Sequence, residues 1–157
     1  MDPVRAALDC GVRTEVARVC RVEGGWAYRA AVDAGAEVFI VDTDSGLRIA
    51  CEPDLVGSRL EAEALRAAAA CASLIKRVAG SRRVAFLHVL RASPGYRLHE
   101  ALRAGGFDVR EAAVRVTYPG SQVGSHEGRR AEVVYSDFSR VSGESVLVIA
   151  DTVATGE

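Results

Sequence analysis

The sequence VLVIADTVATG, residues 146–156, joins an apolar run to a turn of small and hydroxyl residues. We expect the run to form a buried strand that delivers Asp151 to the carboxyl edge of a sheet. The turn can then present successive backbone N–H groups and the hydroxyls of Thr152 and Thr155 to one phosphate, and Gly156 lets the backbone approach it closely. Because the carboxylate of Asp151 is placed to accept hydrogen bonds from vicinal hydroxyls, the stretch predicts a site for a sugar 5-phosphate.

Strand and helix patterns alternate upstream of this turn. A nearly continuous apolar run predicts a doubly covered strand over Arg83 to Leu90. Ser93-Pro94 then provides a helix cap and a first helical residue, for a helix that ends near Ala104. Three further strands are expected, at Val109 to Val116, Ala131 to Tyr135 and Ser145 to Ala150. This order predicts an α/β fold with a mostly parallel, twisted sheet flanked by helices, in which ligands bind beyond the carboxyl ends of the strands.

The N-terminal half carries no phosphate-binding pattern and is expected to supply helices and a hairpin. Apolar spacing favours helical pieces over Met1 to Cys20 and Trp26 to Ala34. Two short β-rich runs around an Asp/Ser/Gly cluster predict a hairpin, formed by Glu37 to Val41 and Leu47 to Cys51. The clearest helix is expected over Arg59 to Ala79, where Ser58 begins the capping pattern S-x-x-E.

The closing turn resembles the phosphoribosyl diphosphate (PRPP) signature of type I phosphoribosyltransferases. That signature has four apolar residues, two acidic residues, two variable residues, and then Ala/Thr-Thr-Gly. The resemblance implies that Asp151 holds the ribose hydroxyls, and that the turn around the 5-phosphate is formed by Thr152, Val153, Ala154, Thr155 and Gly156. The first acidic position is Ala150 in this chain, which removes one contact to a ribose hydroxyl.

A second stretch, VLRASPGY at residues 89–96, resembles the Ile-Leu-Arg-Ala-Gly-x-Gly segment of the uracil phosphoribosyltransferase branch. In that branch the segment is the loop that holds the diphosphate leaving group, which implies this role for Arg91, Ala92, Ser93 and Gly95. Ser93 stands where the family has glycine. The physical reading agrees, because a loop that runs into a helix N-terminus offers free N–H groups to an anion and Arg91 adds a positive charge. A surface salt bridge is the alternative role for Arg91.

The polar stretch from Tyr118 to Arg130 is rich in glycine and serine and is expected to be a mobile loop. The resemblance implies a flexible hairpin here that closes over the substrate and excludes water from an oxocarbenium-like centre. Arg129 and Arg130 would reach the diphosphate on closure; otherwise they are solvated surface charges.

Together these motifs predict a phosphoribosyltransferase that joins a nucleobase to ribose 5-phosphate and releases diphosphate. Asp151 and Arg91 are the expected catalytic residues, and Mg²⁺ would be bound through PRPP and not directly by the protein. The second motif favours uracil, ahead of orotate or a purine. The alternative is a non-catalytic module that binds PRPP or a nucleotide. Family members continue past the turn with a helix, so a lone module and a C-terminally truncated enzyme both remain open for a sequence that ends at Glu157.

Length and composition limit the domain organisation and the classes of partner that we expect for the chain. With 157 residues and a formal net charge of −1, we expect one phosphoribosyltransferase-like domain, in which residues 1–80 supply the N-terminal helices and hairpin and residues 81–157 form the ligand-binding core. The chain lacks the basic excess of a nucleic-acid-binding protein and any apolar run of membrane-spanning length. We therefore expect a cytoplasmic protein, and family analogy predicts a homodimer.

Other candidate sites are weaker. Asp42-Thr43-Asp44 is similar to the nucleophile strand of haloacid-dehalogenase phosphatases, but the apolar run that follows favours a hairpin tip. The four cysteines show no paired-ligand spacing for zinc. His88, His99 and His126 share no metal-ligand spacing either, so the first two are interpreted as structural, and only His126 is a candidate for chemistry.

Overall fold

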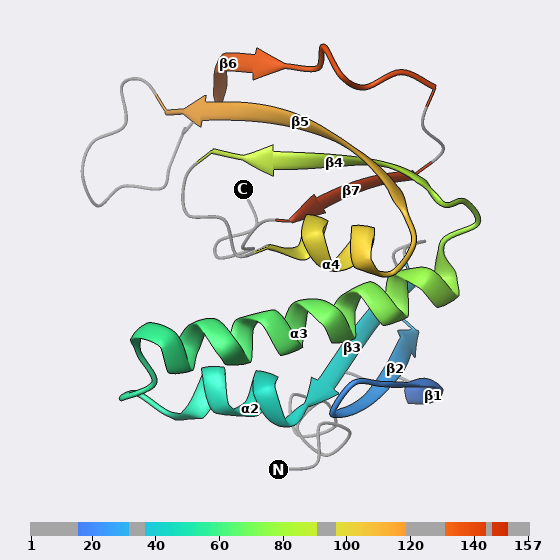
Figure 1. The fold of residues 1–157 in the computed structure, drawn as a ribbon, viewed down its shortest axis with the longest axis vertical. Helices are drawn as coiled ribbons and strands as arrows, with labels where there is room; N and C mark the ends of the chain where they lie inside the picture. Colours follow the sequence, from blue (N-terminus) through green and yellow to red (C-terminus); the bar gives the residue numbers. More distant parts are fainter. Residues whose placement is uncertain (1–15, 32–36, 91–96, 119–130, 144–145, 151–157) are drawn as a thin grey trace. The chain divides into compact units, whose positions relative to one another are not determined.

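The computed structural model describes residues 16–31, 37–90, 97–118, 131–143 and 146–150. This part of the chain is a mixed α/β structure with three helices and two sheets, one of which contains parallel strands (Figure 1). The α/β class expected from the sequence is therefore confirmed, although the sheet with parallel strands is mixed. The chain forms two compact units, Met1–Val78 and Ala79–Glu157.

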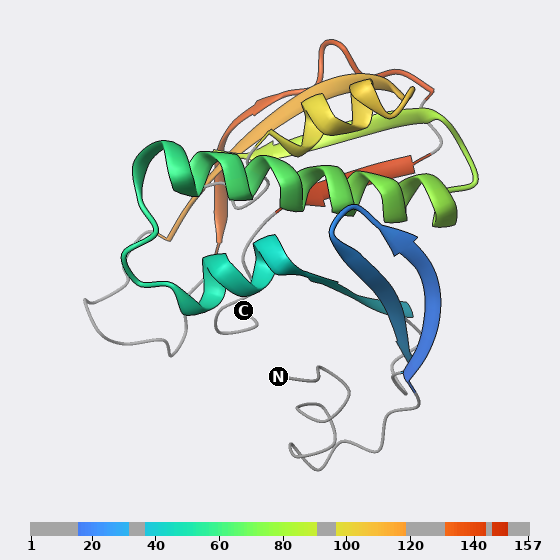
Figure 2. The same cartoon turned by 60° about the horizontal axis from the view of Figure 1, so that its bottom comes forward.

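The first unit contains an antiparallel sheet and two helices. Its elements are β1 (Val16–Val22), β2 (Gly25–Ala31), β3 (Glu37–Thr43), α2 (Asp44–Cys51) and α3 (Gly57–Val78). The strands lie in the order β1-β2-β3, and each pairs with its sequence neighbour (Figure 2). Gly24 has a φ of +71° in the turn between β1 and β2, a conformation that costs glycine little and other residues more.

The helices predicted over Met1 to Cys20 and Trp26 to Ala34 are wrong wherever the structure describes them. Val16–Val22 and Gly25–Ala31 are strands β1 and β2, while residues 1–15 and 32–34 lie outside the described residues. A short apolar run is compatible with both helical and strand periodicity. Here the turn at Gly24 lets the two runs pair as antiparallel strands. The two strands are also joined by a cation–π contact, in which the guanidinium carbon of Arg18 in β1 lies 4.2 Å from the ring centroid of Trp26 in β2.

The hairpin predicted after Glu37 is correct in its first strand and wrong in its second. Glu37–Thr43 forms β3, but the chain then enters helix α2. Thr43 caps this helix, because its side-chain oxygen accepts a hydrogen bond from the backbone N–H of Gly46 at 3.0 Å. Asp44 lies in the first turn, where a negative charge is favourable. The polar cluster is thus a helix start and not a hairpin tip.

Helix α3 confirms the helix predicted from Arg59, and it begins slightly earlier, at Gly57. Its Ala70 and Leu74 pack with Val22 and Ala27 of the sheet in one buried cluster. Ala27 and Ala70 are completely buried, so small side chains allow the helix to approach the strands closely. The helix does not supply a membrane span, and no helix in the described ranges is long and apolar enough to cross a bilayer.

The second unit is built on a four-stranded sheet of order β6-β5-β4-β7. Its elements are β4 (Arg83–Val89), α4 (Leu98–Ala104), β5 (Asp108–Thr117), β6 (Glu132–Asp137) and β7 (Val146–Ala150). Strand β4 is parallel to both β5 and β7, whereas β6 runs antiparallel to β5. All four predicted strands of this half are confirmed. The predicted helix is confirmed over Leu98–Ala104, with Arg97 as its N-cap, while the cap predicted at Ser93 and Pro94 lies outside the described residues.

The core of this unit lies between the sheet and α4. Val84 and Phe86 of β4 and Leu102 of α4 are completely buried. Strand β7, predicted to be buried, is an edge of the described sheet, with alternate residues exposed: Leu147 is 59% and Ile149 54% accessible. The most buried strands are therefore the central ones, β4 and β5. Because β4, β5 and β7 are parallel, their carboxyl ends lie at one edge of the sheet.

Candidate functional site

The carboxyl edge of the second sheet is where the predicted PRPP motifs are attached. His88 pairs with Ala150 across β4 and β7, and with Ala113 across β4 and β5. Because these strands are parallel, Leu90 after β4, Tyr118 after β5 and Ala150 at the end of β7 all lie toward the same edge. The three motifs follow these residues directly in the chain.

The candidate binding residues of these motifs lie outside the described residues. This applies to the diphosphate loop predicted at Arg91, Ala92, Ser93 and Gly95, to Arg129 and Arg130, and to the turn Asp151, Thr152, Val153, Ala154, Thr155 and Gly156. His126 lies outside them as well. The structure does show that the strands leading into these segments, β4, β5 and β7, end at the same edge of the sheet.

A hollow of about 420 Å³ lies beside this edge. Its described lining comes from the segment after β4, from the end of β5 and from β6, and consists of Leu90, Arg115, Val116, Thr117 and Val134. Among these described residues there is one cation and no carboxylate. An anionic group would therefore meet a favourable charge here, and a metal ion would find no carboxylate or imidazole ligand among these described residues. Sequence reasoning did not single out Arg115.

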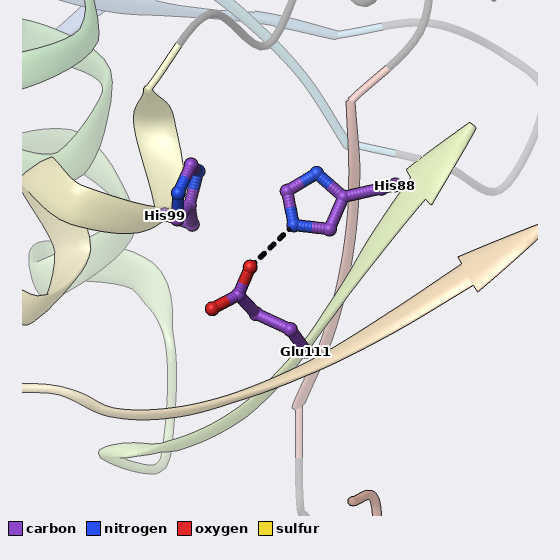
Figure 3. A group of neighbouring side chains, drawn as sticks. All are labelled: His88, His99 and Glu111. Carbon is purple, nitrogen blue, oxygen red and sulfur yellow. Dashed lines mark hydrogen bonds and ion pairs between the residues drawn. The ribbon is translucent and has the colours of Figure 1, made fainter. Parts of the chain in front are cut away.

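A second group of polar side chains lies on the α4 side of the same sheet. His88 comes from β4, Glu111 from β5 and His99 from α4 (Figure 3). Each side chain offers a nitrogen or oxygen, and these three atoms lie within 4.8 Å of one another. The sequence interpretation of His88 and His99 as separate structural residues missed this cluster, because the three positions are distant in sequence and meet only through the sheet register and the position of α4.

Short contacts fix two members of the cluster. Nε2 of His88 lies 2.8 Å from Oε2 of Glu111, and Arg103 of α4 donates a hydrogen bond to Oε1 of the same carboxylate. The hydrogen bond from Arg103 is the main reason that the pKa of Glu111 lies below its usual range, with a further contribution from His88. Glu111 is therefore a carboxylate near neutral pH, with one oxygen directed to the arginine and the other to the histidine.

His99 has a different environment. Its ring lies edge-on to that of His88, with centroids 5.0 Å apart, and tilted against Phe86 at 5.6 Å. Burial lowers the pKa of His99, and the coulombic effect of His88 lowers it further, while that of Glu111 opposes the change. Its Nδ1 atom is buried and has no hydrogen-bond partner among the described residues. The ring is thus held neutral near pH 7 with a nitrogen whose hydrogen-bonding capacity is unused.

No protein-family model, curated protein or solved structure matches the chain.

Proposed function

We propose that the chain binds PRPP at the carboxyl edge of the second sheet and acts as a phosphoribosyltransferase. One observation carries the proposal: β4 and β7 are neighbouring parallel strands, with His88 opposite Ala150. The two motifs that resemble the diphosphate loop and the PRPP signature therefore continue from adjacent strands at one edge. Open sheets with parallel strands bind their ligands in this position.

The chemistry assigned to the chain is mainly charge stabilisation and positioning. Asp151 would accept hydrogen bonds from the ribose hydroxyls, and the Thr152 to Gly156 turn would hold the 5-phosphate through backbone N–H groups. Arg91 and the amides of its loop would hold the diphosphate as charge develops on it. Placing the base nitrogen and the ribose carbon side by side lowers the entropic part of the barrier.

Magnesium fits the site as a part of the substrate. The described lining of the hollow contains Arg115 and no carboxylate, so it suits the oxygens of a phosphate ester better than a bare cation. When bound through PRPP, Mg²⁺ would neutralise the diphosphate. The base acceptor is proposed to be uracil, from the similarity of residues 89–96 to the uracil branch.

A non-catalytic PRPP- or nucleotide-binding module is the second candidate, and one specific observation favours it. Ala150 occupies the first acidic position of the signature, and the structure places it in β7, half-buried and opposite His88. A second carboxylate is therefore missing beside the expected ribose position. Ser93 in place of glycine in the diphosphate loop agrees with this weaker form of the site.

Diphosphate release separates the two candidates. The protein is incubated with PRPP, Mg²⁺ and uracil, orotate or a purine base, and diphosphate is measured, while PRPP binding is followed by calorimetry. Product with any base supports the enzyme and excludes the non-catalytic module. Tight PRPP binding without turnover supports the module. Absence of binding near millimolar PRPP or nucleotide rejects both.

A further inference from the structure

We propose that His88, His99 and Glu111 form a binding site for a divalent transition-metal ion of the zinc type. The proposal does not depend on PRPP binding, since the three side chains lie on β4, α4 and β5 and belong to none of the motifs assigned to PRPP (Figure 3). It is a separate site within the same unit.

The ligand set matches this class of ion. Two imidazoles and one carboxylate form a ligand set that zinc and related first-row metals accept, with positions left open for water. Their donor atoms lie within 4.8 Å of one another, whereas tetrahedral ligands about 2.0–2.2 Å from a shared ion are about 3.3–3.6 Å apart. The most widely separated donors would therefore approach by up to about 1.5 Å, while His88 and Glu111, now 2.8 Å apart, would separate by about 0.5 Å, through side-chain rotations.

The position of each donor is already constrained. His88 and Glu111 face each other at 2.8 Å, and a metal ion would replace the hydrogen that they share. Phe86 supports both imidazole rings, with centroid distances of 4.8 Å to His88 and 5.6 Å to His99. The buried Nδ1 of His99 has no partner among the described residues, and coordination through this atom would satisfy it.

Arg103 completes the arrangement around the carboxylate. It donates to Oε1 of Glu111 and so leaves Oε2 for the ion, in the way that outer hydrogen bonds orient metal ligands in other sites. Its positive charge also disfavours a second cation nearby. We therefore expect moderate affinity and one bound ion per chain.

A metal-free ion-pair network is the competing explanation. Such a network would use Arg103, Glu111 and His88 to join β4, β5 and α4, and it would need nothing from Nδ1 of His99. His99 therefore discriminates between the two explanations. The variant His99→Gln removes its imidazole and leaves the contacts of Glu111 in place, while His126→Gln is the matched control for a histidine outside the cluster.

The test is calorimetry with Zn²⁺ alone, without PRPP or Mg²⁺, on protein whose cysteines are alkylated. Wild type and H126Q should bind one equivalent, and H99Q and Glu111→Gln should each bind at least about 10-fold more weakly. Circular dichroism and urea unfolding without metal verify that the variants are folded. Absence of binding by wild type, or equal binding by H99Q and H126Q, would overturn the proposal.

A measurement on the unmodified sequence covers the case in which the variants fail to fold. Addition of one equivalent of Zn²⁺ should shift the imidazole NMR signals of His88 and His99 and leave those of His126 unchanged. Unchanged signals from His88 and His99 at saturating Zn²⁺ would reject the site. The diphosphate assay contains no added zinc, so the two proposals succeed or fail separately.

Discussion

The hydroxyl of Ser45 in helix α2 donates a 2.7 Å hydrogen bond to Oε2 of Glu63 in helix α3. The carboxylate is buried, and its other oxygen receives Arg48 at 2.9 Å and Arg66 at 2.7 Å. Both arginines remain about half exposed. Glu63 thus joins the two helices of the first unit through one buried hydroxyl and two solvated cations.

Replacing Ser45 by alanine should destabilise the first unit. The change removes a hydrogen bond to a buried charged group, and we expect the melting temperature to fall by about 5 °C. Ser73→Ala is the control, because the Ser73 hydroxyl is exposed and bonds to Ala69 within its own helix. Thermal unfolding followed by circular dichroism measures both; equal melting temperatures for the two variants would contradict the assigned role of Ser45.

The same contacts predict sensitivity to acid. The hydrogen bond from Ser45, with contributions from Arg66 and Arg48, lowers the pKa of Glu63 below its ordinary value. A carboxyl group whose pKa is lower in the folded state stabilises the fold above its unfolded pKa of about 4.3, and this contribution is lost as the pH falls further. Stability should therefore decrease more steeply below about pH 4.3 in wild type than in Glu63→Gln. Parallel curves of melting temperature against pH for the two proteins would show that Glu63 does not contribute.

Gly25 should tolerate no side chain. It begins β2 opposite Thr43 of β3, and a Cβ atom at this position would lie 1.9 Å from the carbonyl oxygen of Asp42. Because that neighbour is backbone, Gly25→Ala should cost about 2 kcal/mol through displaced strands. Gly80→Ala is the control, since a Cβ there meets no atom within 4 Å and its φ is not positive. Urea unfolding compares the two; a Gly25→Ala protein as stable as Gly80→Ala would disprove the predicted clash.

The proposed ribose contact predicts an effect of Asp151. Asp151→Asn replaces a carboxylate acceptor by a neutral amide, so PRPP affinity in the presence of Mg²⁺ should fall by about 10-fold or more. Asp108→Asn, at the opposite end of β5 from the ligand edge, should leave the affinity unchanged. Calorimetric titration with PRPP gives both values, and equal affinities would exclude Asp151 from the site.

Restoring the first acidic position should strengthen the site. Ala150→Glu adds a carboxylate beside Asp151, which should raise PRPP affinity by up to about 10-fold through one further hydrogen bond to the ribose. Ile149→Glu is the control, because it places the same charge at an exposed neighbouring position in β7. Calorimetric titration with PRPP and Mg²⁺ compares the two variants with wild type. A gain in both variants would indicate a general charge effect and not a ribose contact.

The second unit was predictable from sequence because its signals are local and agree with one another. The apolar run from Arg83, the Gly105-Gly106 stop after Ala104 and the β-rich run from Val109 each favour one element, and β4, the end of α4 and β5 follow them. The first unit carries ambiguous runs. Leu47 to Cys51 suits a strand by composition, yet it belongs to helix α2, which begins at Asp44 and is capped by Thr43.

The cluster around Glu111 could not be predicted in the same way. Recognising it requires the register that sets Phe86 opposite Glu111, which places His88 and Glu111 on one face of the sheet, and the seating of α4 that brings His99 to the same face. The spacing of residues in the sequence gives neither the strand register nor the position of α4. The period-2 pair of Phe86 and His88 within an apolar strand was the one local signal, because it placed an imidazole on a core-facing side.

The strand order β6-β5-β4-β7 also has a consequence for folding during synthesis. In the first unit β1 pairs with β2 and β2 with β3, so this sheet needs only pairings between strands that follow one another in the chain. Strand β4 gains its second neighbour only when β7 emerges, after β5 and β6. Pairings between distant segments form slowly and leave apolar strand edges open meanwhile. The sheet of the second unit therefore depends on pairings of longer range in sequence than the sheet of the first unit.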